Sequence, residues 1–200
     1  FVPSFYNLIV NKAGGTLSSR IWTVTNDFEL MLGSFVPNDG SSFFNVKITD
    51  GTFTAPSGNI NVLGNWTRYG GIFVHGIGKV TFNNASADQS INGSQNAQDF
   101  YNLTLIKGSK KLNFSGSISL VAVRNVLTMN SGNIDLGMTG VLELGASPSS
   151  AGTLNYTSGT VINGTSGGFK RWIAGSSEPG IDFPVGTSLN TYKARIIFNN

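Results

Sequence analysis

The stretch FYNLTLIKGSK (residues 100–110) is central to the fold, because it nearly repeats FYNLIVNKAGG (residues 5–15), which begins 95 positions earlier. The apolar spacing F-x-x-L-x-L or F-x-x-L-x-V ends in the two-residue alternation of a β-strand. A second phrase, SGNINVLG (residues 57–64), returns as SGNIDLGM (residues 131–138) and more loosely as SGTVING (residues 158–164). Strand and turn units that recur every 20–30 residues or so are typical of a solenoid. We therefore interpret the repeats as structural, with about four coils of roughly 24 residues between the two FYNL copies.

Most of the remaining sequence also has the pattern of short β-strands. Runs such as SISLVAV and KARIIF are rich in β-branched residues, and turn dipeptides separate such runs: Asp39-Gly40, Asp50-Gly51, Asn92-Gly93 and Asn163-Gly164. The only candidate helical piece is ASADQSI (residues 85–91). We predict an all-β protein and favour a parallel β-helix. A β-sandwich stays possible because it also uses short, closely spaced strands, whereas the irregular spacing fits a propeller less well.

The solenoid interpretation predicts where the apolar residues point. Inward positions should stack Ile, Val, Leu and Phe from coil to coil, while outward positions carry Thr, Ser and Asn. We predict that both FYNL phrases lie on the same side of the rod, with six residues in one continuous core: Phe5, Leu8, Val10, Phe100, Leu103 and Leu105.

Composition excludes several classes of function. The net charge is +3, and the densest basic cluster is only Lys107, Lys110 and Lys111, so no nucleic-acid partner is expected. The chain has no cysteine, which removes disulfides, thiolate catalysis and zinc–thiolate sites. No apolar run approaches 18 residues, so no transmembrane segment is expected. The opening FVPSFYNL lacks a signal-peptide pattern, and we expect the chain to be a segment of something longer.

The sequence offers little catalytic machinery. Of its ten acidic residues, only Asp27 and Glu29 are two positions apart, which on a strand places both on one face, and we favour a solvated pair at a turn. His75 has no nearby nucleophile or carboxylate pattern and is expected to be an outward strand residue. No phosphate-binding loop or nonapeptide calcium repeat is present. We therefore predict no catalytic residues, no metal site and no cofactor.

Aromatic residues are the remaining candidates for binding. Trp66 and Tyr69 flank Arg68, and Trp172 follows a Lys-Arg pair. Exposed rings could stack on sugars, and Arg or Asn could hydrogen-bond the hydroxyls. The alternative is that Trp66 fills the solenoid core. Trp66, Arg68 and Tyr69 are the candidate carbohydrate-binding set.

Three stretches carry a resemblance to a known family: GNWTRYGGIF (residues 64–73), GKVTFNNASADQSINGSQNAQDFYNLTLIK (residues 78–107) and IDFPVGTSLNTYKARIIF (residues 181–198). Their order resembles the repeat regions of large secreted surface proteins of the Bacteroidota. The chain departs from that pattern in two places: Asn84 replaces a glycine, and GGFKRW (residues 167–172) replaces a basic GPVRR-like stretch.

The resemblance implies a right-handed parallel β-helix and export by the type IX secretion system. It also implies an extracellular or cell-surface location, with a role in adhesion or gliding motility. Surface glycans, other surface proteins and the secretion machinery are the partners it implies. Because parallel β-helices also include polysaccharide lyases and glycoside hydrolases, a carbohydrate-active enzyme remains the alternative, and two carboxylates within about 5–10 Å in a groove would favour it.

The chain is expected to divide near residue 167. Residues 1–166 are predicted to form the β-helix coils, and residues 167–200 to form an irregular cap and the start of a following β-sandwich module. Pro184 suits such a cap because it lacks the N–H that a central stacked strand donates.

Overall fold

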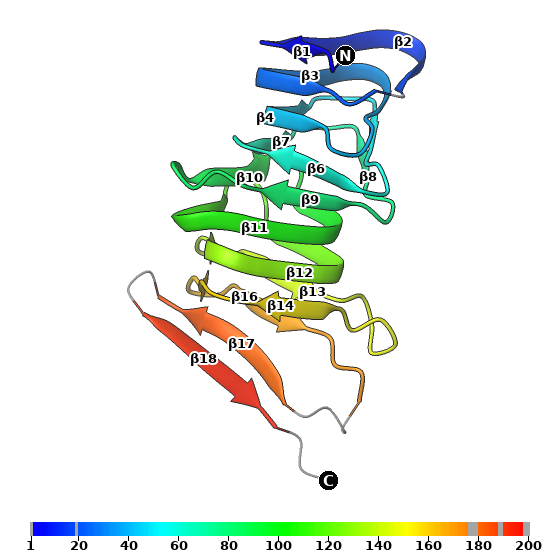
Figure 1. Cartoon of the computed structure of the whole chain (residues 1–200). Helices are drawn as coiled ribbons and strands as arrows, with labels where there is room; N and C mark the ends of the chain where they lie inside the picture. Colours follow the sequence, from blue (N-terminus) through cyan, green and yellow to red (C-terminus); the bar gives the residue numbers. More distant parts are fainter. Residues whose placement is uncertain (1, 19, 176–179, 188–189, 198–200) are drawn as a thin grey trace.

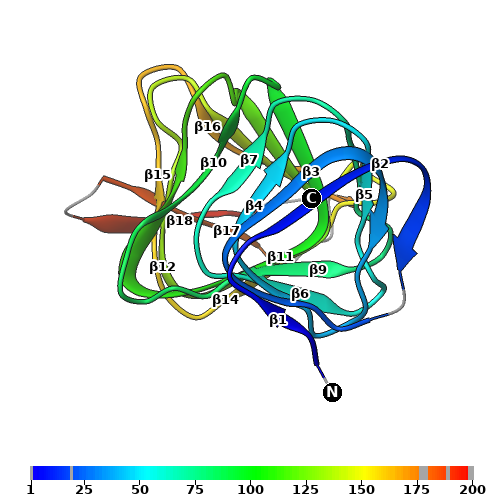
Figure 2. The same cartoon turned by 90° about the horizontal axis from the view of Figure 1, so that it is seen from above.

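The chain forms a β-solenoid of about eight turns. The computed structural model describes residues 2–18, 20–175, 180–187 and 190–197, which contain eighteen strands and no helix. Within this part of the chain, no helix is long and apolar enough to cross a membrane. The coils progress from the N-terminal to the C-terminal end of the molecule and surround a common interior (Figures 1 and 2). The all-β, parallel β-helix prediction is confirmed.

The strands lie on three faces, numbered in the order in which the chain runs through them. Face 1 contains β1 (Ser4–Phe5), β6 (Asn59–Val62), β9 (Lys79–Phe82) and β14 (Thr153–Tyr156). Face 2 contains β7 (Trp66–Arg68), β10 (Gln89–Gly93) and β15 (Val161–Ile162). Face 3 contains β5 (Thr52–Thr54), β8 (Ile72–Val74), β13 (Val141–Leu144) and β16 (Gly168–Arg171). Longer strands bend around corners and serve two or three faces: β2 (Leu8–Ser18), β3 (Thr23–Val36), β4 (Ser42–Ile48), β11 (Ala97–Phe114) and β12 (Leu120–Asp135).

The core consists of columns of inward side chains, one residue from each coil. The face 1 column contains Phe5, Val24, Phe43, Val62, Phe82, Leu105, Met129 and Tyr156. The face 2 column contains Leu8, Phe28, Val46, Trp66, Ile91 and Phe114. Since neighbouring parallel strands are about 4.8 Å apart, each side chain packs directly on the next. This stacking explains why apolar residues recur once per coil.

The coils lengthen toward the C-terminal end. Successive residues of the face 1 column are 19, 19, 19, 20, 23, 24 and 27 positions apart in the sequence. The first increase to 23 falls between Phe82 and Leu105, where the chain adds a loop before β10. This irregular spacing excludes a strict repeat length.

A network of buried polar side chains holds that added loop. Lys107 is 0% exposed, and its Nζ donates to the carbonyl oxygens of Asn84 (2.9 Å) and Ala87 (3.0 Å) and to Oε1 of Gln89 (2.7 Å). Asn84 Oδ1 accepts hydrogen bonds from the backbone N–H groups of Ser86 and Ala87. The candidate helical piece at residues 85–91 is therefore a side-chain-capped loop followed by β10, in agreement with the all-β prediction.

The two FYNL phrases lie on different faces, so their predicted alignment is wrong. Phe5 belongs to face 1 and Leu8 to face 2, whereas Phe100 belongs to face 3 and Leu103 to face 1. The face 1 partner of Phe5 five coils later is Leu105, because the coils between them have unequal lengths.

The predicted core burial holds for most of the six residues. Leu8 packs partly buried against the core, and four others are buried: Val10, Phe100, Leu103 and Leu105. Phe5 is 37% exposed because β1 pairs with β3 and has no described neighbour on its other side.

Parallel stacking continues past residue 166. Strand β16 pairs with β13, and the end of β17 (Ile181–Gly186) pairs with β15. Strand β18 (Thr191–Ile196), expected to open a following module, pairs antiparallel with β17. This hairpin lies at the C-terminal end of the solenoid (Figure 1). Pro184 is opposite Lys193 in the hairpin, and residues 188–189 and 198–200 lie outside the described part of the chain.

Candidate functional site

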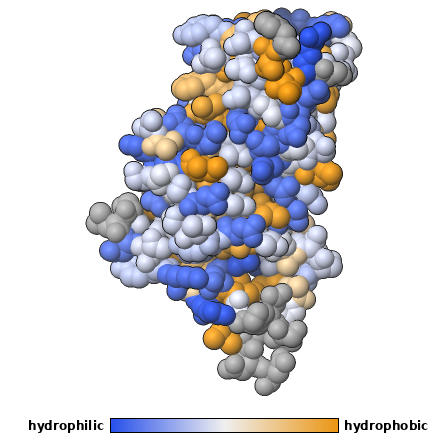
Figure 3. Space-filling view, viewed as in Figure 1, coloured by the Kyte–Doolittle hydropathy of each residue, from blue (hydrophilic) through white to orange (hydrophobic). Residues whose placement is uncertain are grey.

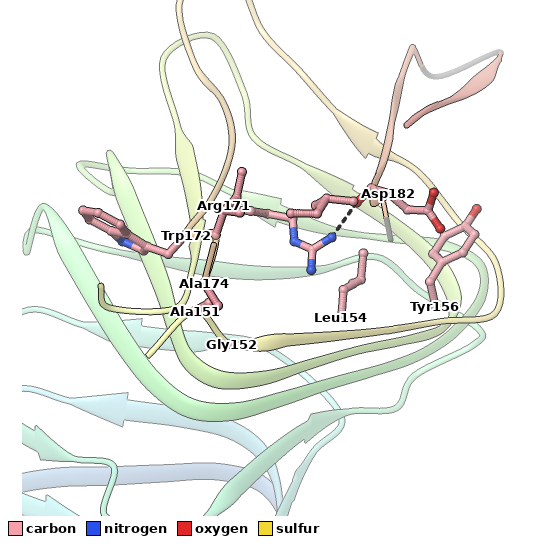
Figure 4. Close-up of a pocket in the computed structure, with 11 residues that line it drawn as sticks. Ala151, Gly152, Leu154, Tyr156, Arg171, Trp172, Ala174 and Asp182 are labelled. Carbon is pink, nitrogen blue, oxygen red and sulfur yellow. Dashed lines mark hydrogen bonds between the residues drawn. The ribbon is translucent and has the colours of Figure 1, made fainter. Parts of the chain in front are cut away.

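A cavity of about 180 Å³ lies where the last coil meets β17 (Figure 4). Residues from three parts of the chain line it: Ala151, Gly152, Leu154, Tyr156, Arg171, Trp172, Ile173, Ala174, Gly180, Ile181 and Asp182. These segments belong to or adjoin β14, β16 and β17, which are separated by loops in the sequence. The stacking of the coils brings them together. The cavity therefore marks the end of the core.

Arg171 occupies an inward position at this end. It continues a face 3 column whose preceding members are apolar: Phe100, Val123 and Leu144. Its Nη1 donates to the backbone oxygen of Asp182 at 2.7 Å, and its guanidinium lies 5.7 Å from the ring centre of Phe183. A positively charged group therefore closes a column that is apolar along the rest of the face.

Asp182 and Tyr156 form the opposite side of the cavity (Figure 4). Oδ2 of Asp182 pairs with Lys193 at 2.8 Å, while its buried Oδ1 has no hydrogen-bond partner among the described residues. Tyr156 is the last inward residue of the face 1 column, and its hydroxyl donates to the Gly159 oxygen at 2.9 Å. The ring is thus fixed at the cavity wall while one carboxylate oxygen remains able to accept a hydrogen bond.

Trp172 contributes to the cavity lining, but its side chain points away from the cavity (Figure 4). Its Nε1 donates to Oε1 of Glu143 at 3.3 Å, and Lys170 lies 4.8 Å from its ring centre. Glu143 also pairs with Lys170 at 2.7 Å and Arg124 at 3.3 Å. Burial alone would raise the pKa of Glu143, but the hydrogen bonds from Lys170 and Trp172 and the nearby positive charges hold it below its usual value. Such a carboxylate is poorly suited to act as a general acid.

The predicted sugar-binding set does not form one surface. Trp66 is 0% exposed and packs edge-on against Phe73 at 4.7 Å, so its ring cannot stack on a sugar. Its Nε1 donates to Oε1 of Gln98 at 3.1 Å. Tyr69 is 48% exposed at the corner between faces 2 and 3, where Lys47 lies 5.7 Å from its ring centre. Of the two aromatic residues in the set, only Tyr69 presents its ring to solvent.

Arg68, the third member of the set, closes an opening in face 3. Strand β8 pairs with β5, but among the described residues it forms no ladder with the start of β11, the next strand on that face. Arg68 bridges the opening, donating from Nε to Gln98 Oε1 (3.1 Å) and from its other nitrogens to the oxygens of Gly71 and Ala97. Burial lowers the pKa of Arg68, and the charge of Asp99 opposes that shift. These bonds assign Arg68 a structural role in joining two coils.

The carboxylate and histidine candidates also have ordinary surroundings. Asp27 and Glu29 lie outward within β3 rather than at a turn, and Glu29 pairs with Lys47 at 2.9 Å. Burial would raise the pKa of Glu29, but hydrogen bonds from Lys47 and Thr49 outweigh it and lower the pKa. His75, expected on a strand, instead directly follows the end of β8; its Nδ1 is 2.7 Å from the Gly76 oxygen, and its ring stacks on Tyr101. The described residues contain no group of three or more His, Cys, Asp or Glu that could hold a metal ion.

Three cavities in the described part of the chain each contain a single carboxylate residue. The cavity at the core end contains Asp182, a second of about 250 Å³ beside Arg68 contains Asp99, and a third of about 350 Å³ contains Asp39. Asp99 and Glu143 both contact Arg124, at 2.8 and 3.3 Å, so a guanidinium lies between the two carboxylates. None of these three cavities is lined by the pair of carboxylates that the enzyme alternative predicts.

Sequence reasoning noticed Trp172 and its basic neighbours but missed Tyr156 and Asp182 as site residues. The available signal was the loss of the regular coil pattern after residue 167, where an Arg replaces the expected apolar inward residue.

No protein-family model matches this chain, and the searches of curated proteins and of solved structures also gave no match.

Proposed function

We propose that this chain is a non-catalytic, extracellular β-solenoid segment of a surface protein and serves as a stalk or adhesive repeat. The observation that carries the proposal is the unbroken face 1 column from β1 to β14. At about 4.8 Å per coil, eight coils make a rod of about 38 Å. A rod of this kind is suited to holding a binding surface away from a cell.

Hydrogen bonds between coils support the rigidity that a stalk needs. At the corner between faces 1 and 2, asparagine side chains accept from the backbone N–H of the next coil: Asn7 from Asp27 (3.1 Å), Asn45 from Asn65 (2.8 Å) and Asn65 from Ser90 (2.8 Å). These bonds add to the backbone ladders on the flat faces. They give the many asparagines of the sequence a structural use.

The character of the surface supports adhesion more than catalysis. Polar and apolar residues are interspersed over the face shown in Figure 3. Charged residues make up only 12% of the chain, so the polar surface consists largely of neutral groups. Such a surface is suited to hydrogen-bonded contact with glycans or other surface proteins. The proposal includes that the chain belongs to a surface protein of the Bacteroidota that is exported by type IX secretion. This part of the proposal rests on the sequence resemblance.

The test separates binding from catalysis on the same substrates. The whole chain is incubated with a panel of immobilised and soluble polysaccharides, and retention, new reducing ends and unsaturated products are measured. Retention without products is expected. Product formation that disappears in Glu143→Gln or Asp99→Asn would establish the carbohydrate-active alternative and overturn the proposal. Absence of retention on glycans and on whole bacterial cells would overturn the adhesive role.

A further inference from the structure

The cavity of about 350 Å³ lies along the edge at which face 1 begins. Three residues of its lining, Asn59, Lys79 and Asn102, are register partners in β6, β9 and β11, and the first two of these strands lie side by side in Figure 1. Asp39 adds a carboxylate from the coil before them. Four coils at the usual strand spacing extend for about 14 Å, so the cavity is a groove along the rod axis.

Neighbouring coils hold the amides of the groove in place. Nδ2 of Asn102 donates to the backbone oxygen of Ile77 at 3.2 Å, and its Oδ1 accepts from Nδ2 of Asn125 at 2.9 Å. Oδ1 of Asn59 accepts from Oγ1 of Thr81 at 2.6 Å. Each of these amide oxygens retains a second lone pair. Hydrogen-bonding groups that are already fixed lose little entropy when a ligand binds.

Two charged side chains of the groove have capacity for further hydrogen bonds. The Lys79 ammonium forms no ion pair or hydrogen bond with any residue in the described ranges. Oδ1 of Asp39 accepts the backbone N–H of Asn59, which leaves Oδ2 available. Gly58 permits this arrangement, because a Cβ there would overlap the Asp39 carboxylate.

The outward residues of face 1 continue the groove as a nearly uncharged surface. From β6 to β14 they come two from each coil: Asn59 and Asn61, Lys79 and Thr81, Asn102 and Thr104, Val126 and Thr128, and Thr153 and Asn155. Lys79 is the one charged residue of these ten, and Asp39 in the groove balances its charge. Thr81 and Thr104 are only 5% and 7% exposed, so the column that lines the groove is the more accessible one.

We infer that this groove binds an uncharged polysaccharide chain that lies along the rod axis. The inference deepens the proposed adhesive function and rests on it for its biological role. Sugar hydroxyls donate and accept hydrogen bonds, so they complement both the Lys79 ammonium and the Asp39 carboxylate. Ile77, which is 63% exposed and contacts Asn102 through its backbone, supplies apolar surface for a sugar ring. The volume falls within the roughly 300–1,000 Å³ of small-ligand sites.

The experiment titrates the whole chain with hexasaccharides of glucose, xylose, mannose and N-acetylglucosamine and with the matching monosaccharides, followed by calorimetry and ligand-observed NMR. At least one hexasaccharide is expected to bind tenfold or more tightly than its monosaccharide, because the groove crosses several coils. Its affinity should not change as salt is raised. No binding, or equal binding of hexasaccharide and monosaccharide, would overturn the inference. Tighter binding of oligogalacturonate or of a chitosan hexamer than of every neutral hexasaccharide would also overturn it.

Variants locate the site. Ser57→Trp fills the groove with a large ring, and Lys79→Ala removes its ammonium; both wild-type side chains are exposed, so both variants are expected to fold. Each should weaken binding at least tenfold. Lys110→Ala is the matched control, since it removes the same charge just before the face 2 part of β11 and should leave binding unchanged. Equal affinity of Ser57→Trp and wild type would place the ligand elsewhere and overturn the inference.

Retention on polysaccharides and on whole bacterial cells separates this inference from the proposed function. Wild type is expected to be retained and Ser57→Trp to be lost. If both are retained equally, the adhesive role stands and the groove inference falls. If neither is retained on any glycan or on cells, the adhesive role itself falls.

Discussion

Lys107 illustrates at the residue scale how a buried cation can fix a loop. Its ammonium reaches from β11 to two backbone oxygens and to Gln89, at 2.7 to 3.0 Å. Burial lowers the pKa of Lys107 to about 8, and the charge of Asp88 opposes that shift. The folded protein therefore binds this proton less tightly than the unfolded chain, in which a lysine titrates near 10.4.

The free energy of unfolding is therefore expected to change with pH in the alkaline range. Between about pH 8 and about pH 10.4 the unfolded state binds more protons at Lys107, so its contribution to the free energy of unfolding rises with pH. Denaturant unfolding of the wild type and Lys107→Met at several pH values measures it. The difference between the two curves is expected to grow in favour of the wild type over this window. Curves that stay parallel would contradict the prediction, since all other titrating groups are common to both proteins.

Gly93 tests the close approach of successive coils. Its φ is +133°, and a Cβ there would overlap the carbonyl oxygen of Arg68 in the coil before it. Gly40 provides a matched control, because its φ is +86° and its Cβ would meet nothing within 4 Å. Gly40→Ala is expected to cost about 1–2 kcal/mol of unfolding free energy from backbone strain alone. Gly93→Ala should cost about 1–3 kcal/mol more through the steric overlap. Equal losses of unfolding free energy in the two variants, measured by denaturant unfolding, would refute the predicted close approach.

At the scale of elements, β11 links all three faces. Its first residues lie on face 3, Leu103 and Leu105 on face 1, and its last residues on face 2. Leu103 is 0% exposed, whereas Ile106 in the same strand is 44% exposed. Leu103→Ala is expected to cost about 2–5 kcal/mol, and Ile106→Ala no more than about 0.5 kcal/mol. Urea unfolding of both variants checks this, and similar losses would mean that burial does not set the cost.

The sequence was sufficient to predict strands but not their alignment. Strand period and turn residues are local signals, so the all-β solenoid could be predicted from phrases such as FYNL. The alignment of the two phrases could not be predicted, because it depends on the length of each coil. A loop after Asn84 lengthens one coil, and Lys107 of the following coil stabilises that loop. Similarly, Arg171 and Asp182 meet only after β16 and β17 stack, and no local pattern encodes that meeting.

Taken as a whole molecule, the rod has central coils with neighbours on both sides and end strands with fewer. Strand β12 pairs with β11 and with strands of the following coil, whereas β18 pairs only with β17 among the described residues and is exposed throughout. At the other end, β2 pairs with β3 and most of its residues are exposed. In a stack stabilised by nearest-neighbour contacts, the ends should open without the centre.

Hydrogen exchange measured by mass spectrometry tests this directly. Amides of β11 and β12 are expected to exchange at least about a hundredfold more slowly than those of β2 and β18, because opening the ends breaks fewer contacts. Leu103→Ala should then speed exchange in β9, β11 and β12, its own strand and its face 1 neighbours, more than in β4 and β3, which are three and four coils away. Equal protection along the rod, or an equal effect of the substitution on all strands, would show that the solenoid unfolds as one cooperative unit. In that case its stability would depend on the whole column rather than on each pair of coils.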